Sequence, residues 1–211
     1  MSTDTKQVVT EEKPVEEKPV EEKPVEEKPA AKPAAKPAAK PAAKPVELPA
    51  FEKSISDKVV EKFGDKIQVE FVKENRVGIK VNREDVHDVA EFIRDGLNYD
   101  HVESVSGVDY PQDKEIEVVY HIGSYSDSSL AKQILVLATR AQREENPIPG
   151  KDATKLPTLR DIFYSVEFHE REVFEMFGVY FTGHPDNRRL LLPEDWADLP
   201  PLRKDFAIKG R

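Results

Sequence analysis

The 211-residue sequence contains no cysteine. This absence excludes disulfides, thiolate zinc sites, iron–sulfur clusters ligated by this chain and a cysteine nucleophile. Glycine is scarce, with nine residues, and none of them forms a GxGxxG or P-loop array. Nucleotide binding through those motifs is therefore excluded. A GxSxG nucleophile elbow is also missing, which argues against an α/β-hydrolase.

Long apolar runs are missing too. The longest lies near Ile134–Ala138 and is far too short to span a bilayer. The N-terminal residues Met1–Lys6 lack the apolar region of a secretory signal, so we expect a cytoplasmic protein. The net charge is −9, and this acidic balance argues against DNA or RNA as a partner, because phosphate neutralisation needs a basic surface.

Residues 1–50 are of low complexity. Glu-Glu-Lys-Pro-Val occurs three times over Glu11–Val25, and a shorter Ala-Lys-Pro-Ala repeat continues to Ala42. The frequent prolines block helix formation, and few apolar residues are available for burial. The segment predicts a disordered, partly polyproline-II tether. It is a spacer in the simplest interpretation and a docking arm of a soluble adaptor in the alternative.

Residues 51–145 predict an α+β domain that starts with a helix and a β-hairpin. We expect the helix to be capped by Ser54 and to end at Gly64. Apolar residues alternate from Lys66 to Val72 and again from Val77 to Val81, which is typical of two strands. The apolar helix positions are Ile55, Val59, Val60 and Phe63, and those of the first strand are Ile67, Val69 and Phe71.

A second helix and three further strands complete this domain. Asn82 is expected to cap the helix, whose apolar face consists of Val86, Val89, Ala90, Ile93 and Leu97. Strands are predicted from His101 to Val108, over Ile116–Ile122 and over Ile134–Ala138. The last is interpreted as a central strand, with a short helix from Ser128 or Ser129 as the alternative. Together these elements form a mainly antiparallel sheet packed by two helices.

Residues 146–211 predict a helix and turn followed by an extended, partner-binding tail. After a polar connection over Gln142–Lys155, a short helix is expected to begin within Pro157–Phe163. The next helix has Val173, Phe174 and Phe177 on its apolar face and would be stabilised by Glu167–Arg171 and Arg171–Glu175 pairs. The tail is apolar but rich in turns, so we expect it to lie over another surface, of this domain or of a neighbour.

The same helix concentrates the polar residues that could carry chemistry. His169 and Glu172 are three residues apart and could share a metal, with Glu175 and His184 as further ligands. A di-iron carboxylate site needs paired Glu-x-x-His motifs on separate helices, and there is no second one. The arginines that follow could lock the segment onto the domain, clamp a partner or contact a substrate. The other histidines, His87, His101 and His121, are interpreted as structural.

One run is similar to a known family signature. It comprises Glu170-Arg171-Glu172, Glu175, Met176-Phe177, His184, Arg188 and Leu190-Leu191, with Leu156–Phe163 and Val166–His169 upstream and Pro200–Phe206 downstream. This run resembles the signature of the 30-kDa subunit of respiratory complex I, also called its C subunit. The resemblance is strong over residues 115–206 and weaker over 51–114. Two positions depart from it, since Glu175 stands where Asp is frequent and Asn187 where Leu is usual.

The resemblance implies a hydrophilic, non-catalytic subunit in the peripheral arm of a proton-translocating NADH or F420H2: quinone oxidoreductase, on the cytoplasmic face of the cell membrane. It implies no catalytic, cofactor-binding or metal site on this chain. The complex would use iron–sulfur clusters, a quinone-type acceptor and NADH or F420H2. A subunit of a membrane-bound energy-converting hydrogenase and a carboxylate/His metalloenzyme are the alternatives.

The partners implied by the resemblance are the 49-kDa-type subunit, also called the D subunit, and the iron–sulfur subunit, also called the B subunit. The expected interface residues are Glu170, Arg171, Glu172, Glu175, Phe177, Gly178, His184, Pro185, Asp186, Arg188 and Arg189.

Overall fold

The computed structural model describes residues 49–145, 154–196 and 198–208. The predicted tether lies outside the described residues, apart from Pro49 and Ala50, which are the N-cap and the first residue of the first helix. Most of the predicted connection between Gln142 and Lys155 also lies outside them.

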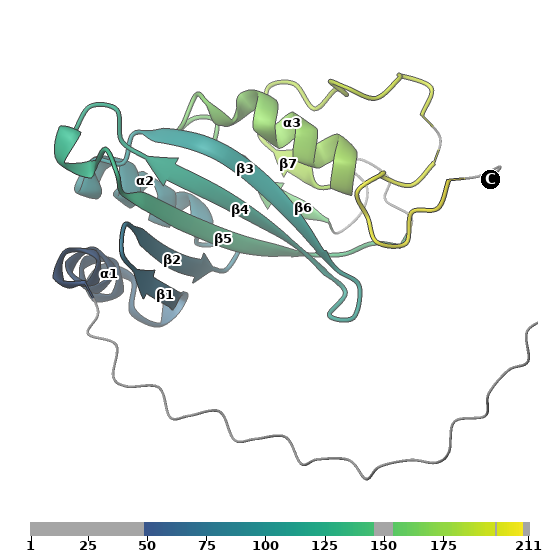
Figure 1. Cartoon of the computed structure of the whole chain (residues 1–211). Coiled ribbons are helices and arrows are strands. Elements are labelled where there is room, and N and C mark those ends of the chain that lie inside the picture. Colours follow the sequence, from purple (N-terminus) through teal and green to yellow (C-terminus); the bar gives the residue numbers. More distant parts are fainter. Residues whose placement is uncertain (1–48, 146–153, 197, 209–211) are drawn as a thin grey trace, which may run out of the picture. The chain divides into compact units, whose positions relative to one another are not determined.

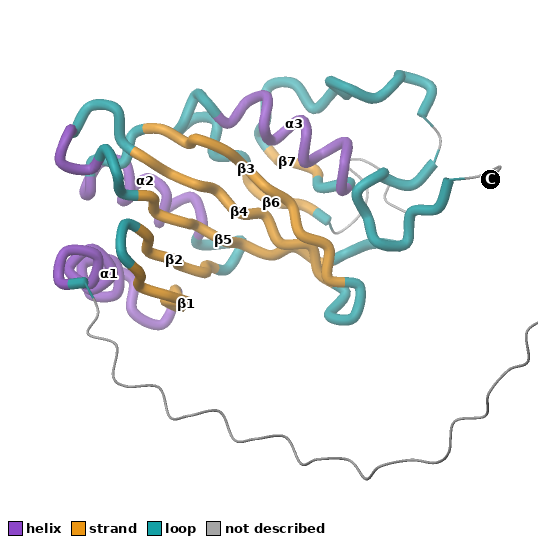
Figure 2. The backbone as a smooth tube through the Cα atoms, viewed as in Figure 1, coloured by secondary structure: helices purple, strands orange, loops and turns teal. Residues whose placement is uncertain are grey.

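A five-stranded sheet forms the centre of the described part (Figures 1 and 2). Its order is β1-β2-β5-β4-β3, and all neighbours are antiparallel except β2 and β5, which are parallel. The predicted hairpin and the central position of the strand from Ile134 are confirmed. The strands are β1 (Ile67–Lys73), β2 (Arg76–Val81), β3 (His101–Tyr110), β4 (Glu115–Gly123) and β5 (Ile134–Gln142).

Helices α1 (Ala50–Phe63) and α2 (Val86–Leu97) pack with the sheet into one hydrophobic core. Both predicted caps are wrong. The hydroxyl of Ser54 lies inside α1 and donates to the Phe51 carbonyl, whereas Asn82 precedes a turn that delays the start of α2. Burial of the apolar face of each helix in the core decides where the helix begins, and this effect outweighs a local side-chain cap.

A β-bulge in β1 changes the face on which Phe71 lies. Val69 pairs with Ile79, whereas Phe71, beyond the bulge, pairs with Gly78. Because neighbouring residues of a strand point to opposite faces, Phe71 lies on the face opposite to Ile79. The predicted alternation through Phe71 is therefore broken. A Cβ atom on Gly78 would lie 2.3 Å from the Phe71 ring, so this glycine makes room for the ring.

The C-terminal part adds a third helix and a small parallel sheet. The elements are β6 (Lys155–Pro157), α3 (Val166–Phe177) and β7 (Tyr180–Thr182), and two 3-10 turns lie earlier at Gly64–Lys66 and Ser128–Leu130. The structure is thus α+β with a mixed sheet and three helices, and the predicted fold class is confirmed. None of the helices in the described residues has the length and apolar character of a membrane span.

The short helix predicted within Pro157–Phe163 is wrong, because the chain continues from β6 into turns. The Thr158 amide donates to the Thr182 carbonyl, and the Leu159 amide donates to the Glu170 carboxylate. These tertiary partners, distant in the sequence, hold the segment in a non-helical conformation.

Candidate functional site

Helix α3 has a buried face and an open face. Val173, Phe174 and Phe177 are buried, as predicted. The Phe177 ring lies against β3, where a Cβ atom on Gly107 would be 2.4 Å from it. On the opposite side Phe168 is 58% exposed. The helix is therefore fixed to the sheet while one of its faces lies open to solvent.

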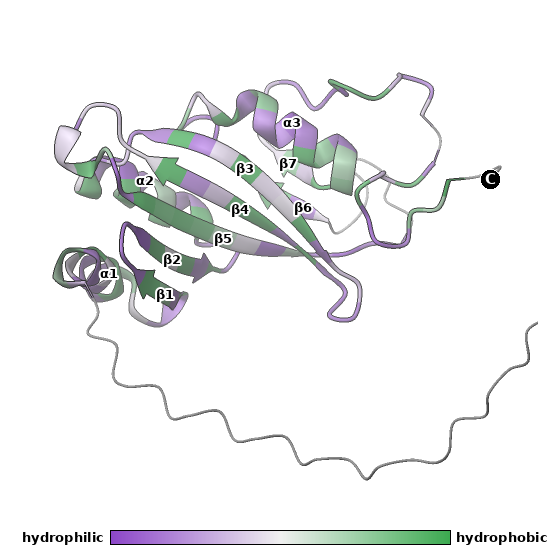
Figure 3. Ribbon diagram, viewed as in Figure 1, coloured by the Kyte–Doolittle hydropathy of each residue, from purple (hydrophilic) through white to green (hydrophobic). Residues whose placement is uncertain are grey.

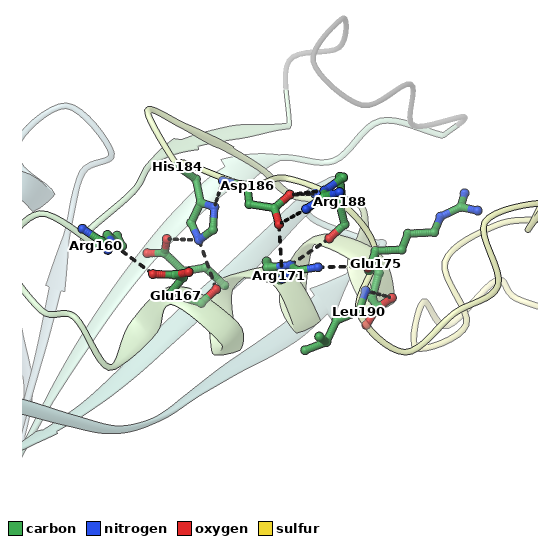
Figure 4. Close-up of polar contacts among 10 residues, drawn as sticks. Arg160, Glu167, Arg171, Glu175, His184, Asp186, Arg188 and Leu190 are labelled. Carbon is green, nitrogen blue, oxygen red and sulfur yellow. Dashed lines mark hydrogen bonds and ion pairs between the residues drawn. The ribbon is translucent and has the colours of Figure 1, made fainter.

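The salt bridges predicted along α3 do not form (Figure 4). Glu167 pairs with Arg160 instead, with 3.1 Å between Oε2 and Nε, and Arg171 pairs with Asp186, with 3.4 Å between Nη1 and Oδ2. Exposed pairs along a helix contribute only a few tenths of a kcal/mol, at about 0.3–0.5, so partners from other segments prevail. The charges of α3 therefore attach it to the chain before and after it.

The Glu175 carboxylate binds three consecutive backbone amides. The amides of Leu190, Leu191 and Leu192 donate to it at 2.9–3.0 Å. Glu175 is only 4% exposed, and charge-assisted hydrogen bonds of this kind are strong. Gly178 ends the helix in the left-handed region at φ 78°, which turns the chain away towards β7. The returning turn is thereby fixed to the last turns of α3.

Two arginines hold the same turn by its carbonyl groups. Arg171 donates to the carbonyls of Arg188 and Arg189, at 3.0 Å each. The Arg189 guanidinium donates to three more carbonyls of the segment that follows. Those carbonyls belong to Pro193, Glu194 and Trp196, at 2.9, 2.9 and 2.7 Å. Arg189 is thus an internal lock of this turn.

Arg188 has a different environment. Its side chain is 85% exposed and donates to both carboxylate oxygens of Asp186, at 2.8 and 3.0 Å. These hydrogen bonds lower the pKa of Asp186 to about 2. Most of the Arg188 side chain faces solvent, while its guanidinium stays paired with Asp186.

His184 closes the turn with both ring nitrogens. Nε2 donates to the Glu167 carbonyl, and Nδ1 accepts from the Asp186 amide, each at 3.0 Å. Pro185, next to it, is exposed. Since both nitrogens already have partners, the imidazole has none left for a metal.

The alternative of a metal site gains no support from the geometry. Within residues 49–145, 154–196 and 198–208, no three His, Asp or Glu side chains gather closely enough to hold a metal ion. Glu172 is exposed, while Glu175 is already occupied by backbone amides. The proposed ligands therefore do not come together.

Glu170 lies inside the protein. Its carboxylate accepts from the Thr158 hydroxyl at 2.5 Å, the Leu159 amide at 2.9 Å and the Tyr120 hydroxyl at 3.1 Å. Burial raises the pKa of Glu170 to about 7, although these hydrogen bonds act in the opposite direction. His184 Nε2 is 3.9 Å from the carboxylate. Glu170 therefore joins α3 to β4 and to the turn after β6.

The C-terminal tail returns to its own domain. The Leu202 amide donates to the Met176 carbonyl at 3.1 Å, and Arg203 Nε donates to the Phe177 carbonyl at 2.6 Å. The Lys204 amide donates to the Asp109 carboxylate at 2.9 Å. The sequence left two surfaces possible for this tail, that of its own domain and that of a neighbour. These contacts are made with its own domain.

An ion pair that the sequence did not single out anchors this tail. Arg143 Nε lies 2.6 Å from Asp109 Oδ1, and its Nη2 lies 2.7 Å from Asp205 Oδ1. Both Arg143 and Asp109 have nearly buried side chains. In the sequence this ion pair is marked only by Asp109, a carboxylate placed directly after apolar strand residues. Such a placement is common on solvated strands, so it does not predict a buried ion pair.

Comparison with known proteins places this geometry in a family. Residues 79–211 match the family model described as respiratory-chain NADH dehydrogenase, 30 Kd subunit. The chain belongs to this family. The resemblance inferred from the signature run is confirmed, and the match to the 30-kDa subunit family contains α2, β3 to β7 and α3 while leaving out α1 and β1.

Similar proteins carry consistent names. The chain is 35% identical over 131 residues to the C subunit of F(420)H(2) dehydrogenase from Methanosarcina mazei, covering 62% of this chain and 75% of that protein. It is 35% identical over 156 residues to the C subunit of NADH-quinone oxidoreductase from Chlorobium phaeobacteroides, covering 72% and 87%. It is also 35% identical over 128 residues to the C/D subunit of NADH-quinone oxidoreductase from Phocaeicola vulgatus, covering 61% of this chain and 22% of that longer protein.

Among solved structures, a chain of the membrane-bound sulfane sulfur reductase, an archaeal respiratory membrane complex, has a similar fold. The TM-score is 0.59 with 27% sequence identity, and the similarity covers 74% of this chain and 86% of that one. The fold of the 30-kDa subunit family thus recurs within a respiratory membrane complex.

Proposed function

We propose that this chain is a non-catalytic scaffold subunit in the peripheral arm of a membrane-associated, proton-translocating NADH or F420H2: quinone oxidoreductase. The observation that carries the proposal is the turn after β7. Its backbone is held by hydrogen bonds from the side chains of Glu175, Arg171 and Arg189. The side chains of Leu190 and Leu191 stay 42% and 62% exposed. A rigid backbone that displays apolar side chains suits a protein interface.

Each of the two exposed aromatic rings of this region contacts an arginine. Arg160 lies over the Tyr164 ring at 4.5 Å, and Arg171 lies over the Phe168 ring at 5.9 Å while also binding the turn. We call the set Tyr164, Phe168, Leu190 and Leu191 the α3 surface. Aromatic and arginine side chains are enriched at protein interfaces, so the α3 surface has the composition of a binding site.

The partner proposed for the α3 surface is the 49-kDa-type D subunit, with the iron–sulfur B subunit next to it. The relative named as a C/D subunit supports a D-type partner, since a fused chain keeps its two parts close together. The chain itself has no cysteine, so the iron–sulfur clusters of the complex would be ligated by other subunits. It would reach the cytoplasmic face of the membrane through the complex.

Charge insertion into the α3 surface tests this proposal. Phe168→Asp and Leu191→Asp in the full chain should each lower co-purification of the 49-kDa-type subunit about tenfold or more, because each buries a carboxylate in an apolar contact. Val60→Asp is the matched control, since Val60 is an apolar residue of α1 that is 43% exposed. If all three variants retained the 49-kDa-type subunit equally, the proposal would be contradicted.

The absence of catalysis is tested on the isolated chain. Electron transfer from NADH or reduced F420 to a quinone analogue should stay at the rate of the buffer alone when the purified chain is added. Turnover that scales with the concentration of the chain would show that it is an enzyme by itself.

A further inference from the structure

The open face of α3 carries a stripe of side chains that are spaced four residues apart. Residues at this spacing are neighbours on a helix, so Phe168, Glu172 and Met176 follow one another along α3. Phe168 and Glu172 are exposed, and Met176 is partly buried. Figure 3 shows the middle of α3 as hydrophilic and its C-terminal end as more hydrophobic. The charge of Glu172 thus lies between an aromatic ring and an apolar end of the helix.

The stripe ends at a small groove between α3 and β3. The groove has a volume of about 240 Å³, and Glu172 is the only charged residue among the described residues that line it. Its apolar lining consists of Val105, Gly107, Val173, Met176, Phe177 and Leu202. Leu202 is 55% exposed, and its amide donates to the Met176 carbonyl, which holds it at the rim. A small apolar groove of this kind suits an apolar side chain of a partner.

Glu172 differs from the other carboxylates of α3, because it has no partner in the described part of the chain. Glu167 pairs with Arg160, while Glu170 and Glu175 accept hydrogen bonds inside the protein. No ion pair among the described residues includes the Glu172 carboxylate. Water solvates this carboxylate in the free chain, so it needs no cation until a neighbour covers it.

A neighbour that contacts both apolar ends of the stripe must cover Glu172. Four residues advance a helix by about 6 Å, so Glu172 lies midway between Phe168 and Met176, which are about 12 Å apart along the axis. A partner surface that spans this distance removes the carboxylate from water. A buried carboxylate without a cation weakens an interface, whereas a pair with lysine or arginine fixes the register of the two surfaces.

We propose that the partner of the α3 surface presents a lysine or arginine to Glu172, between an apolar residue that contacts Phe168 and another that enters the groove beside Leu202. The occupant is a segment of the 49-kDa-type subunit, because the groove continues the α3 surface on the same helix. This inference rests on the proposed function and adds to it the chemistry of the segment that the partner uses.

The rate at which the 49-kDa-type subunit leaves the immobilised complex tests the cation. The complex is purified with a tagged, full-length chain that carries either Glu172→Leu or Glu91→Leu. Leucine is a good helix former, so both variants keep their helices. Glu172→Leu leaves the partner's cation buried without a counter-charge, so dissociation should be about tenfold faster. Glu91→Leu makes the same change at an exposed position of α2 and should leave the rate unchanged.

The direction of the effect decides between the possible contacts of Glu172. If the carboxylate faced an apolar surface of the partner, leucine would fit that surface better and dissociation would slow down. If Glu172 stayed in water, the rate would not change. Either result would overturn the inference. Recovery of a second copy of this chain in place of the 49-kDa-type subunit would overturn it too.

The groove is tested in the same assay. Leu202→Asp places a charge at the rim and should make dissociation about tenfold faster. Val60→Asp is again the control on α1, with a similar exposed fraction, and should leave the rate unchanged. Equal rates in these two variants would overturn the assignment of the groove as part of the contact.

Phe168→Asp separates this inference from the proposed function. Rapid loss of the 49-kDa-type subunit from this variant, together with an unchanged rate for Glu172→Leu, would overturn the inference and leave the proposed function standing. Unchanged rates for both Phe168→Asp and Leu191→Asp would contradict the proposed function itself.

Discussion

Glu170 makes the stability of the fold depend on pH. Its pKa rises from 4.5 to about 7 in the folded chain, so the folded form keeps a proton that the unfolded form releases over this range. The contribution of Glu170 to the free energy of unfolding should therefore be largest below pH 4.5 and fall by about 3 kcal/mol in total as the pH rises to 7.

The Glu170→Gln variant isolates this contribution. A glutamine has no proton to release, so the wild-type chain should lose stability relative to the variant as the pH rises. The measurement is denaturant unfolding of both proteins at several pH values. A constant difference between the two curves would mean that Glu170 does not titrate in this range.

The adjacent arginines should have separable effects. Arg189→Ala removes the donor for three backbone carbonyls and should lower the free energy of unfolding by about 1–2 kcal/mol. Arg188→Ala removes an exposed side chain and should leave the melting temperature unchanged while weakening retention of the 49-kDa-type subunit. If both substitutions affected melting equally, the assignment of Arg189 as the internal lock would be wrong.

At the scale of elements, α3 and the turn after β7 behave as one unit through Glu175. Glu175→Gln places a side-chain amide donor against three backbone amide donors and should lower the free energy of unfolding by about 2 kcal/mol. Amide hydrogen exchange at Leu190, Leu191 and Leu192 should speed up in the same variant. Glu172→Gln, an exposed position on the same helix, should change stability by less than about 0.5 kcal/mol. Similar exchange rates in both variants would contradict the attachment.

The elements themselves were largely predictable from the sequence. The periodicity of Val86 to Leu97 predicts α2, and the apolar run at Ile134 predicts a central strand, because burial of one face depends on local spacing. The face of Phe71 was not predictable, since a single bulge reverses it. The partners of Glu175 were also missed, because its amides lie 15–17 residues away and a turn brings them together.

At the scale of the whole molecule, Arg143 connects the tail to the sheet, because it pairs with both Asp109 of β3 and Asp205 of the tail. Asp109→Asn leaves the nearly buried Arg143 without its closest carboxylate and should lower the free energy of unfolding by about 3 kcal/mol. Amide exchange at Lys204 should speed up as the tail is released. Asp113→Asn, in the exposed turn between β3 and β4, is the control. It should change neither the free energy of unfolding nor the amide exchange at Lys204. Unchanged exchange in Asp109→Asn would show that the tail is held by other contacts.

The central claim is that this chain works as a fixed part of a larger respiratory assembly. The most direct measurement is the protein composition of the complex purified with a tagged, full-length chain from its own cells. The account predicts the 49-kDa-type and iron–sulfur subunits in amounts equal to the chain. A chain recovered alone, at its own mass of 23.9 kDa, would contradict it.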